Sequence, residues 1–249
     1  MSSFEEIVSN QKMNYDAVLK SIIQTWNNEN IRPKLLIHSC CAPCSTFVLE
    51  TLVQYTDITI YFTNPNIHPQ EEYEYRSLVL QKFIWEFNKK NNKNVLFIED
   101  SYNPAIFFEK TAQYKDAPEG GKRCFLCYQM RLEQVAQKAT ELSYDYFATT
   151  LTISPKKNSQ LINQLGFEIQ RVFPVKYLPS DFKKNNGYQR SIQLCKEYNI
   201  YRQHYCGCIF AAEQQGIDLN VTINNIKQGI EKLEAEKTSV VKQKHSCYA

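Results

Sequence analysis

The chain has 249 residues, of which 43% are hydrophobic and 22% are charged, and its formal net charge is +3. This length suits one α/β domain or two small ones, and the near-balance of charge neither demands nor excludes nucleic acid as a partner. No stretch reaches the roughly 18 uninterrupted apolar residues of a membrane span, and the N-terminus lacks the basic and apolar regions of a secretion signal. We therefore expect a cytoplasmic protein without a membrane partner.

Short apolar runs alternate with longer polar or amphipathic stretches along the chain. In chain order we predict a helix at about 15–26, a strand at 34–38, a helix from Ser45, a strand at 58–62, a helix at 71–90, a strand at 95–98, a helix at 124–142, strands at 145–149 and 167–173, and a peripheral helix with a loose end at 216–249. Strands that alternate with helices of this length are typical of a doubly wound parallel sheet. The seven glycines form neither a GxGxxG nor a P-loop pattern, so neither phosphate-binding fingerprint is present.

Seven of the nine cysteines fall into three short groups. In a cytoplasmic protein such groups indicate a metal or catalytic site before they indicate structural disulfides. The first group lies on a strand-to-helix turn, where open α/β sheets bind ligands. Of the two single cysteines, Cys195 lies in a helical pattern and is predicted to be a core thiol, and Cys247 is predicted to be a free thiol in the tail. The three groups are Cys40-Cys41-x-x-Cys44, Cys124-x-x-Cys127 and Cys206-x-Cys208.

Two of these groups can supply four thiolates to one metal centre. Cys124 and Cys127 are three residues apart, so both lie on one face at the start of the predicted helix, where the helix dipole lowers thiol pKa values. Cys40 and Cys41 can reach two different irons if their turn is sharp. Four thiolates are the usual complement of a [4Fe–4S] cluster, although the same four would also hold a structural zinc ion.

The third group differs because a glycine separates its two cysteines. Gly207 permits the strained backbone that a disulfide between Cys206 and Cys208 would require, and a strained, accessible disulfide is easily reduced. Such a pair could hold two electrons beside the metal centre. The alternative is that Cys206 and Cys208 complete the metal site itself.

Longer motifs around these cysteines resemble a known family, the cobalamin-independent epoxyqueuosine reductases of the QueH type. The resemblance runs from about Lys34 to Glu213, and several long motifs in one order make it specific. The motifs are His38-Ser-Cys-Cys-Ala-Pro-Cys-Ser45, Asn64-Pro-Asn-Ile-His-Pro69, Pro118-Glu-Gly-Gly-Lys-Arg-Cys-Phe-Leu-Cys127, Thr149-Thr-Leu-Thr-Ile-Ser-Pro155, Asp181-Phe-Lys-Lys-Asn-Asn-Gly-Tyr-Gln-Arg190 and Tyr201-Arg-Gln-His-Tyr-Cys-Gly-Cys208.

The resemblance implies a tRNA-modifying oxidoreductase with an iron–sulfur cluster. Such enzymes reduce the epoxide of epoxyqueuosine at the wobble position of tRNA to give queuosine and water, with electrons from an external donor. By motif position, a [4Fe–4S] cluster would be held by Cys40, Cys41, Cys124 and Cys127, and Cys206 and Cys208 would form a redox-active disulfide. Cys44 would either bind an additional iron or line the pocket.

The implied fold is one Rossmann-like α/β domain with the cluster at the carboxyl ends of the strands. We expect this catalytic domain at 34–213, after a helical extension at 1–33 and before a peripheral helix and tail at 214–249. The loop with Cys40 and Cys41 stands where related tRNA-modifying folds carry a phosphate loop, so we do not expect activation by ATP.

The implied reaction needs a proton donor and a surface for tRNA. The candidates for the general acid are His38, His68 and Asp181, each of which lies in a motif loop. Binding of tRNA calls for phosphate contacts from basic side chains and stacking on aromatic ones. The residues that offer this combination near the third cysteine group are Lys183, Lys184, Tyr188, Arg190, Tyr201 and Arg202.

Two other functions remain open at the level of sequence. One is an iron–sulfur-dependent tRNA sulfur-transfer enzyme with Cys206 and Cys208 as sulfur carriers, although the missing pyrophosphatase-type loop counts against it. The other is a zinc-stabilised RNA-binding domain in which the cysteines only hold the fold.

Overall fold

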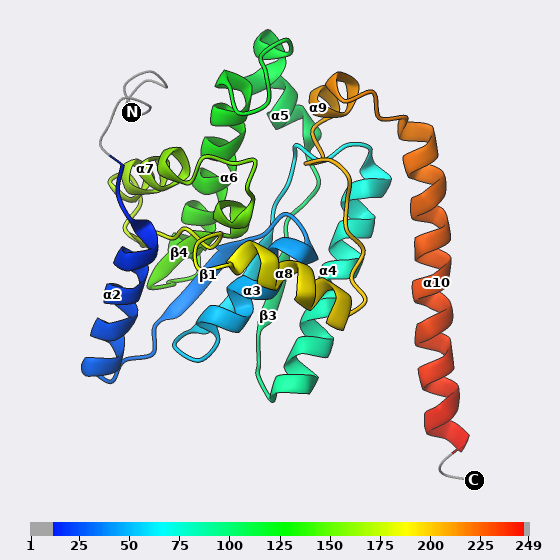
Figure 1. Ribbon diagram of the computed structural model, residues 1–249, viewed down its shortest axis with the longest axis horizontal. Coiled ribbons are helices and arrows are strands. Elements are labelled where there is room, and N and C mark those ends of the chain that lie inside the picture. Colours follow the sequence, from blue (N-terminus) through cyan, green and yellow to red (C-terminus); the bar gives the residue numbers. More distant parts are fainter. Residues whose placement is uncertain (1–11, 247–249) are drawn as a thin grey trace.

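A sheet of five parallel strands forms the centre of the molecule (Figure 1). The computed structural model describes residues 12–246, and side chains as far as residue 235. The strand order is β3-β2-β1-β4-β5, so the chain winds outward from β1 in one direction and then in the other. This confirms the predicted doubly wound α/β architecture. The strands are β1 (Lys34–His38), β2 (Asp57–Phe62), β3 (Leu96–Glu99), β4 (Tyr146–Thr149) and β5 (Lys176–Tyr177).

Helices connect the strands and cover both faces of the sheet. No helix among the described residues is both long and apolar enough to cross a membrane. The predicted free thiol Cys247 lies outside the described residues. The helices are α2 (Tyr15–Asn28), α3 (Ala42–Leu52), α4 (Gln70–Asn91), α5 (Pro104–Thr111), α6 (Lys122–Glu141), α7 (Ser159–Gln170), α8 (Gly187–Glu197), α9 (Ile209–Gln214) and α10 (Leu219–Ser246), with 3-10 turns η1 (Ala112–Tyr114) and η2 (Thr150–Ile153).

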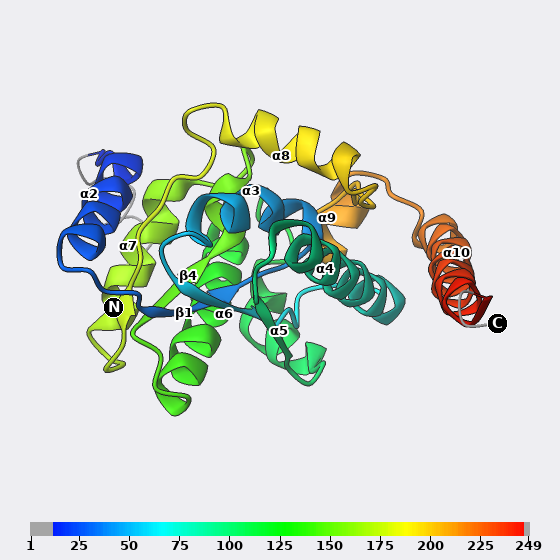
Figure 2. The same cartoon turned by 90° about the horizontal axis from the view of Figure 1, so that it is seen from below.

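Side chains that alternate along the strands divide the interior into two cores. Leu35 and Ile37 of β1 pack into a core that α2, α3 and α4 complete. Leu36, between them, packs on the other face in a core that α6 and α7 complete. Figure 2 shows α3 and α8 on one side of the sheet and α6 on the other. All three β1 side chains are fully buried, and each such burial is worth roughly 1.5–3 kcal/mol.

The prediction of a strand at 167–173 is wrong. Most of these residues form the last turns of α7, and the fifth strand is the short β5 that follows. The reason is the four-residue spacing of Leu161, Leu165 and Ile169, which places all three on the buried face of a helix. Asn158 fixes where this helix begins, because its side chain accepts hydrogen bonds from the amides of residues 160 and 161.

The helix after β1 begins three residues earlier than predicted. It starts at Ala42, so Cys44 lies in its first turn rather than in the preceding loop. Pro43 explains the early start, since proline is well tolerated in the first turn of a helix, where its missing N–H has no partner to lose. Cys41 is the N-cap residue, with an extended backbone. The first cysteine group therefore spans a helix N-terminus.

The packing of α8 on α3 depends on a glycine. A Cβ at Gly187 would overlap the carbonyl oxygen of Phe182 and the ring of Phe47. We expect Gly187→Ala to lower the free energy of unfolding by about 1–3 kcal/mol, the usual cost of overpacking. Gln189→Ala, at an exposed position of the same helix, should change it by no more than about 0.5 kcal/mol. Urea unfolding of both variants tests this, and equal midpoints would contradict it.

Candidate metal and redox site

The site lies at the carboxyl edge of the sheet, where the loops after β1 and β2 meet. The amide of Ser39 donates to the carbonyl of Tyr61 at 3.0 Å, which extends the pairing of these two strands by one residue. The side chain of Asn64 then donates to the carbonyl of Ser39 at 2.8 Å. Parallel strands end at the same edge, so this arrangement brings the first cysteine group against the loop after β2.

The three cysteines of the first group lie close enough to share a metal. The sulfurs of Cys40, Cys41 and Cys44 are all within 4.8 Å of one another. Those of Cys40 and Cys41 are 3.6 Å apart. Hydrogen bonds from Cys41 and Cys44 lower the pKa of Cys40, whereas burial raises the pKa of Cys41 to about 12. The thiolate form is thus favoured at Cys40, and three sulfurs this close together are the kind of donor set that soft metals bind.

Folding brings members of all three cysteine groups around one small cavity of about 20 Å³. Two of them, Cys124 and Cys127, lie in the first two turns of α6, and the amide of Gly120 donates to the sulfur of Cys124 at 3.3 Å. Burial raises the pKa of Cys127 to about 11. The chemistry of this donor set fits a thiolate-bound metal or cluster. The thiols that line the cavity are Cys40, Cys124, Cys127, Cys206 and Cys208.

The backbone between Cys206 and Cys208 requires glycine. Gly207 has φ of +103°, and a Cβ there would lie 2.8 Å from Cγ1 of Ile67. Both cysteines are free thiols. A hydrogen bond from Cys208, with the positive charge of Lys157, lowers the pKa of Cys206 to about 5, and the same hydrogen bond raises the pKa of Cys208. The two thiols are therefore chemically unequal.

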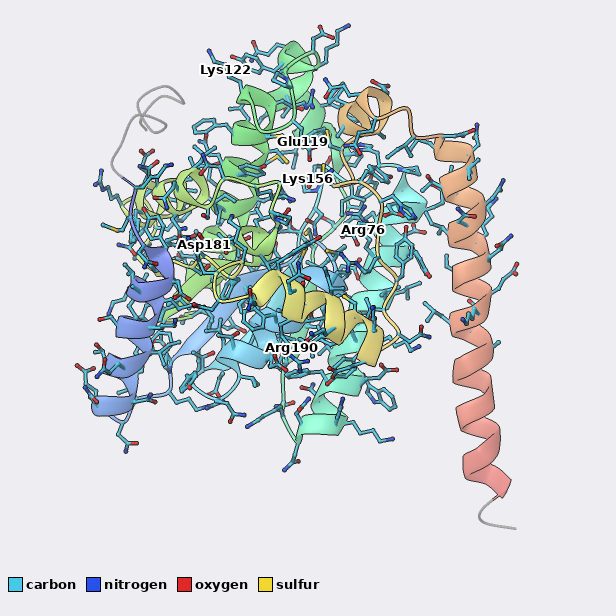
Figure 3. The ribbon with its side chains drawn as sticks, in the orientation of Figure 1. Arg76, Glu119, Lys122, Lys156, Asp181 and Arg190 are labelled. Atoms are coloured by element: carbon cyan, nitrogen blue, oxygen red, sulfur yellow. The ribbon has the colours of Figure 1, made fainter. Side chains whose placement is uncertain are left out.

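A second, larger cavity of about 170 Å³ adjoins the small one and is more open. Cys40, Glu119, Lys157 and Cys206 line both cavities. Figure 3 shows Glu119 and Lys156 labelled beside each other above the carboxyl edge of the sheet. A molecule in the larger cavity would therefore directly contact Cys40, Cys206 and also Cys44, which lines only the larger cavity.

Comparison with known proteins identifies the family. A family model described as Epoxyqueuosine reductase QueH matches residues 35–214. A relative from Staphylococcus aureus named "Epoxyqueuosine reductase QueH" is 53% identical, over 93% of this chain and 98% of its own. Proteins of the same name from Streptococcus pyogenes and Staphylococcus epidermidis are 53% and 56% identical, over 88% and 85% of this chain and 88% and 90% of theirs.

The chain belongs to the epoxyqueuosine reductase QueH family. The resemblance seen in the motifs is thereby confirmed. The family match ends close to the C-terminus of α9, so it includes all three cysteine groups and excludes α10.

Arg76 of α4 holds the third cysteine group in place. Its buried guanidinium forms an ion pair with the buried carboxylate of Glu72, with Nε and Oε1 2.6 Å apart. Its two terminal nitrogens donate to the carbonyls of Tyr205 and Cys206, each at 3.1 Å. One side chain thus ties α4 to the segment at 205–206 and brings a positive charge close to Cys41.

Two further cations lie near the cysteines of this site. Arg131 is buried, and its Nε donates to the carbonyl of Cys127 at 3.1 Å. Lys157 is half-buried and lines both cavities. Its charge acts on Cys40 and Cys206. Positive charge at this position favours thiolate over thiol and favours any anionic group bound among the cysteines.

The two histidines considered as acids lie outside the cavities, with both ring nitrogens of His38 and one of His68 hydrogen-bonded. His38 is buried, with Nδ1 2.9 Å from Oγ1 of Thr149 and Nε2 3.3 Å from Oδ1 of Asn64. Burial lowers the pKa of His38 to about 3, so this imidazole is neutral. Nδ1 of His68 lies 3.0 Å from the carbonyl of Asn66, and burial lowers its pKa too. Neither side chain lines either described cavity.

Asp181 and the two lysines after it lie beside the larger cavity rather than in it. The carboxylate of Asp181 accepts from the hydroxyl of Ser159 at 2.9 Å and lies 3.6 Å from Nζ of Lys183. Lys183 also donates to the carbonyl of Lys157 at 2.9 Å, so it supports the loop that brings Lys157 to the site. Lys184 is exposed.

The remaining residues predicted to bind tRNA divide into two sets. Tyr188 and Arg202 line the larger cavity. Arg190 and Tyr201 do not line it. The guanidinium of Arg190 binds both carboxylate oxygens of Glu50, at 2.6 and 3.0 Å, and Glu197 at 2.8 Å, and the hydroxyl of Tyr201 donates to Glu72 at 3.4 Å. Figure 3 shows Arg190 on α8, away from the labelled Glu119 and Lys156.

The site also contains charged residues that were not assigned from the sequence. Glu119 lies within one motif that carries the family resemblance, and Lys157 lies two residues after another. Their positions in the sequence could therefore have pointed to the site. Arg76 and Arg131 lie inside long helices and in none of the motifs quoted, and nothing local distinguishes them from exposed arginines. Only the tertiary structure shows that both are buried against cysteine-bearing segments.

The role of Arg76 can be tested by removing its charge. Arg76→Met should lower the free energy of unfolding by about 3–5 kcal/mol, because it leaves Glu72 buried and unpaired. It should also free the segment at 205–206, which would speed the alkylation of Cys206 in metal-free protein. Lys20→Met, in an exposed ion pair with Asp16, should cost less than about 1 kcal/mol. Chemical unfolding and mass spectrometry of alkylated peptides give both readouts, and equal costs for the two variants would contradict a buried pair.

Proposed function

We propose that this protein is an epoxyqueuosine reductase that converts epoxyqueuosine at the wobble position of tRNA into queuosine and water. The observation that carries the proposal is that five thiols from three distant segments surround one small cavity, and two of them also line an open one. Membership of the QueH family supports the same activity. Because its substrate would be tRNA, we further propose a cytoplasmic location.

The cluster ligands in this proposal are Cys40, Cys41, Cys124 and Cys127. Cys40, Cys124 and Cys127 line the small cavity together, and Cys41 is 3.6 Å from Cys40. When bound, a [4Fe–4S] cluster supplies single electrons that originate from an external donor. Cys44 is close enough to Cys40 and Cys41 to bind an additional iron, and this stays part of the proposal.

Cys206 and Cys208 would supply the two electrons that the reaction needs. Removal of an epoxide oxygen as water consumes two electrons and two protons and leaves a carbon–carbon double bond. Oxidation of one thiolate and one thiol to a disulfide releases two electrons and one proton, so the pair supplies both electrons of one turnover, and the second proton comes from the proton donor. Cys206 faces the open cavity, and its pKa of about 5 keeps it as a thiolate at neutral pH. The electron donor then returns the disulfide to the dithiol.

We propose that the larger cavity receives the modified base, with tRNA phosphates along its rim. Tyr188 offers a stacking surface, and Lys156 and Arg202 are exposed cations that line the cavity. Lys183 and Lys184 lie nearby and extend the proposed footprint. We leave Arg190 out because two carboxylates already hold its guanidinium.

The proton donor for the leaving oxygen stays a proposal among residues of the motif loops. His68 remains a candidate because its Nε2 is buried and, among the described residues, has no hydrogen-bond partner. His38 has both ring nitrogens hydrogen-bonded, and Asp181 is held by Ser159 and Lys183.

We also propose the division into an extension at 1–33, a catalytic domain at 34–213 and a tail at 214–249, which the family match at 35–214 supports.

The division of roles among the cysteines predicts different losses on substitution. Cys124→Ala should lose iron and stability together, because cluster ligation and folding are coupled. Cys206→Ala should keep iron and sulfide yet lose multiple turnover of epoxyqueuosine-containing tRNA. Anaerobic purification, iron, sulfide and zinc analysis, an absorption spectrum and a turnover assay measure all of this. Cys195→Ala, at a buried thiol of α8, is the control for handling and oxidation.

Two results would contradict this proposal. Zinc without sulfide in the anaerobically purified wild-type protein would indicate a structural metal site and a binding protein. Loss of iron from Cys206→Ala to the same extent as from Cys124→Ala would make the third group part of the metal site instead of a separate redox pair.

The proposed footprint predicts charge effects on tRNA affinity. Lys156→Glu and Arg202→Glu should each weaken binding and reduce the slope of log affinity against log salt by about 1 per lost phosphate contact. Lys89→Glu serves as the control, because Lys89 is near the C-terminus of α4, at the opposite edge of the sheet. Filter binding over a range of salt concentrations gives the slopes. If Lys156→Glu and Arg202→Glu show the same slope as the wild-type protein and the Lys89→Glu control, Lys156 and Arg202 are not part of the footprint.

A further inference from the structure

One carboxylate lies where the two cavities meet. Glu119 is the only acidic residue among the described residues that line either cavity, and it lines both. Every other charged side chain there is basic. Those around the larger cavity are Lys156, Lys157 and Arg202, and those around the smaller one are Arg123, Arg131 and Lys157.

The position of Glu119 is defined by its neighbours in the chain. Gly120 has φ of +89°, and its amide donates to the sulfur of Cys124 at 3.3 Å. The amide of Gly121 donates to the carbonyl of Pro118 at 3.0 Å, which closes the turn. This turn anchors Glu119 directly against a cysteine of the site. Within the described part of the chain, no hydrogen bond or ion pair occupies its exposed carboxylate.

A carboxylate without a partner among cations suggests that a bound group supplies the missing charge. Epoxyqueuosine carries a secondary amine between its deazaguanine ring and its epoxide-bearing cyclopentane ring, and this amine is an ammonium ion at neutral pH. The basic residues that attract tRNA phosphates would repel such an ammonium as it enters the cavity. A carboxylate at the junction, beside the thiol that faces the epoxide, offsets that repulsion and forms a charge-assisted hydrogen bond.

We propose that Glu119 binds the secondary ammonium of epoxyqueuosine and thereby selects tRNA that carries the modified base. This inference rests on the proposed reductase function and adds a specificity residue to it. Unmodified guanine has no ammonium at this position, so Glu119 should contribute nothing to binding of unmodified tRNA. The contribution of the carboxylate should thus appear in the ratio of the affinity for modified tRNA to the affinity for unmodified tRNA.

Equilibrium binding without reductant measures this ratio directly. The probes are one tRNA with epoxyqueuosine at the wobble position and the same tRNA with guanine there. Glu119→Gln should lower the preference for the modified tRNA by about tenfold, as expected for one charge-assisted hydrogen bond, and leave the affinity for unmodified tRNA within about twofold. Asp116→Asn is the matched control, because Asp116 lies in the same loop and lines neither cavity.

Several outcomes overturn the inference. These are a wild-type protein that does not prefer modified tRNA, an unchanged preference in Glu119→Gln, and equal losses for both tRNAs. An unchanged preference with lost single turnover would make Glu119 a proton donor instead. Turnover by the wild-type protein is measured in parallel, so that failure of the reductase function is distinguished from failure of the inference. A preference that depends on Glu119 would support the inference even if no reduction occurs.

Discussion

The buried ion pair between Glu72 and Arg76 is the interaction on which the site depends. A buried charge is tolerated only when its partner and its hydrogen bonds are complete. Here Nε of Arg76 binds Glu72, and its terminal nitrogens bind the carbonyls of Tyr205 and Cys206. The planar guanidinium allows these bonds in one geometry only. The last cysteine group, some 130 residues from Arg76 in sequence, is therefore fixed against α4 and above the sheet edge.

This arrangement also explains the charge balance of the site. Cys40 and Cys206 both have lowered pKa values, and the positive charges near them come from three different segments. Arg76 belongs to α4, Arg131 to α6 and Lys157 to the loop after η2. Each cation thus approaches from a different side, and together they favour negative charge among the sulfurs. Thiolate-rich sites need such compensation because burial alone would keep the thiols protonated.

The sequence predicts the parts of this structure that depend on local patterns. Strand β1 and the helices at α2, α4 and α6 follow from the spacing of their apolar residues, and the turn after β1 follows from the position of Cys40 and Cys41. Two local predictions are wrong: the helix after β1 begins at Ala42 rather than at Ser45, and the strand predicted at 167–173 is mostly helix because Leu161, Leu165 and Ile169 repeat every four residues. The pairing of Arg76 with the segment at 205–206 has no local signal, since it depends on how α4 packs. The same holds for Arg190, whose binding of Glu50 joins α8 to α3.

The two thiols of the last group face different surroundings, and this asymmetry bears on the direction of the proposed chemistry. Cys206 is half-buried and lines both cavities, whereas Cys208 lines only the small one and packs in a core with Phe107 and Met130. The hydrogen bond between them lowers the pKa of Cys206 and raises that of Cys208. In thiol–disulfide chemistry the accessible thiolate reacts first and the protected thiol follows. Substrate in the open cavity would therefore meet Cys206, while Cys208 stays beside the thiols proposed to hold the cluster.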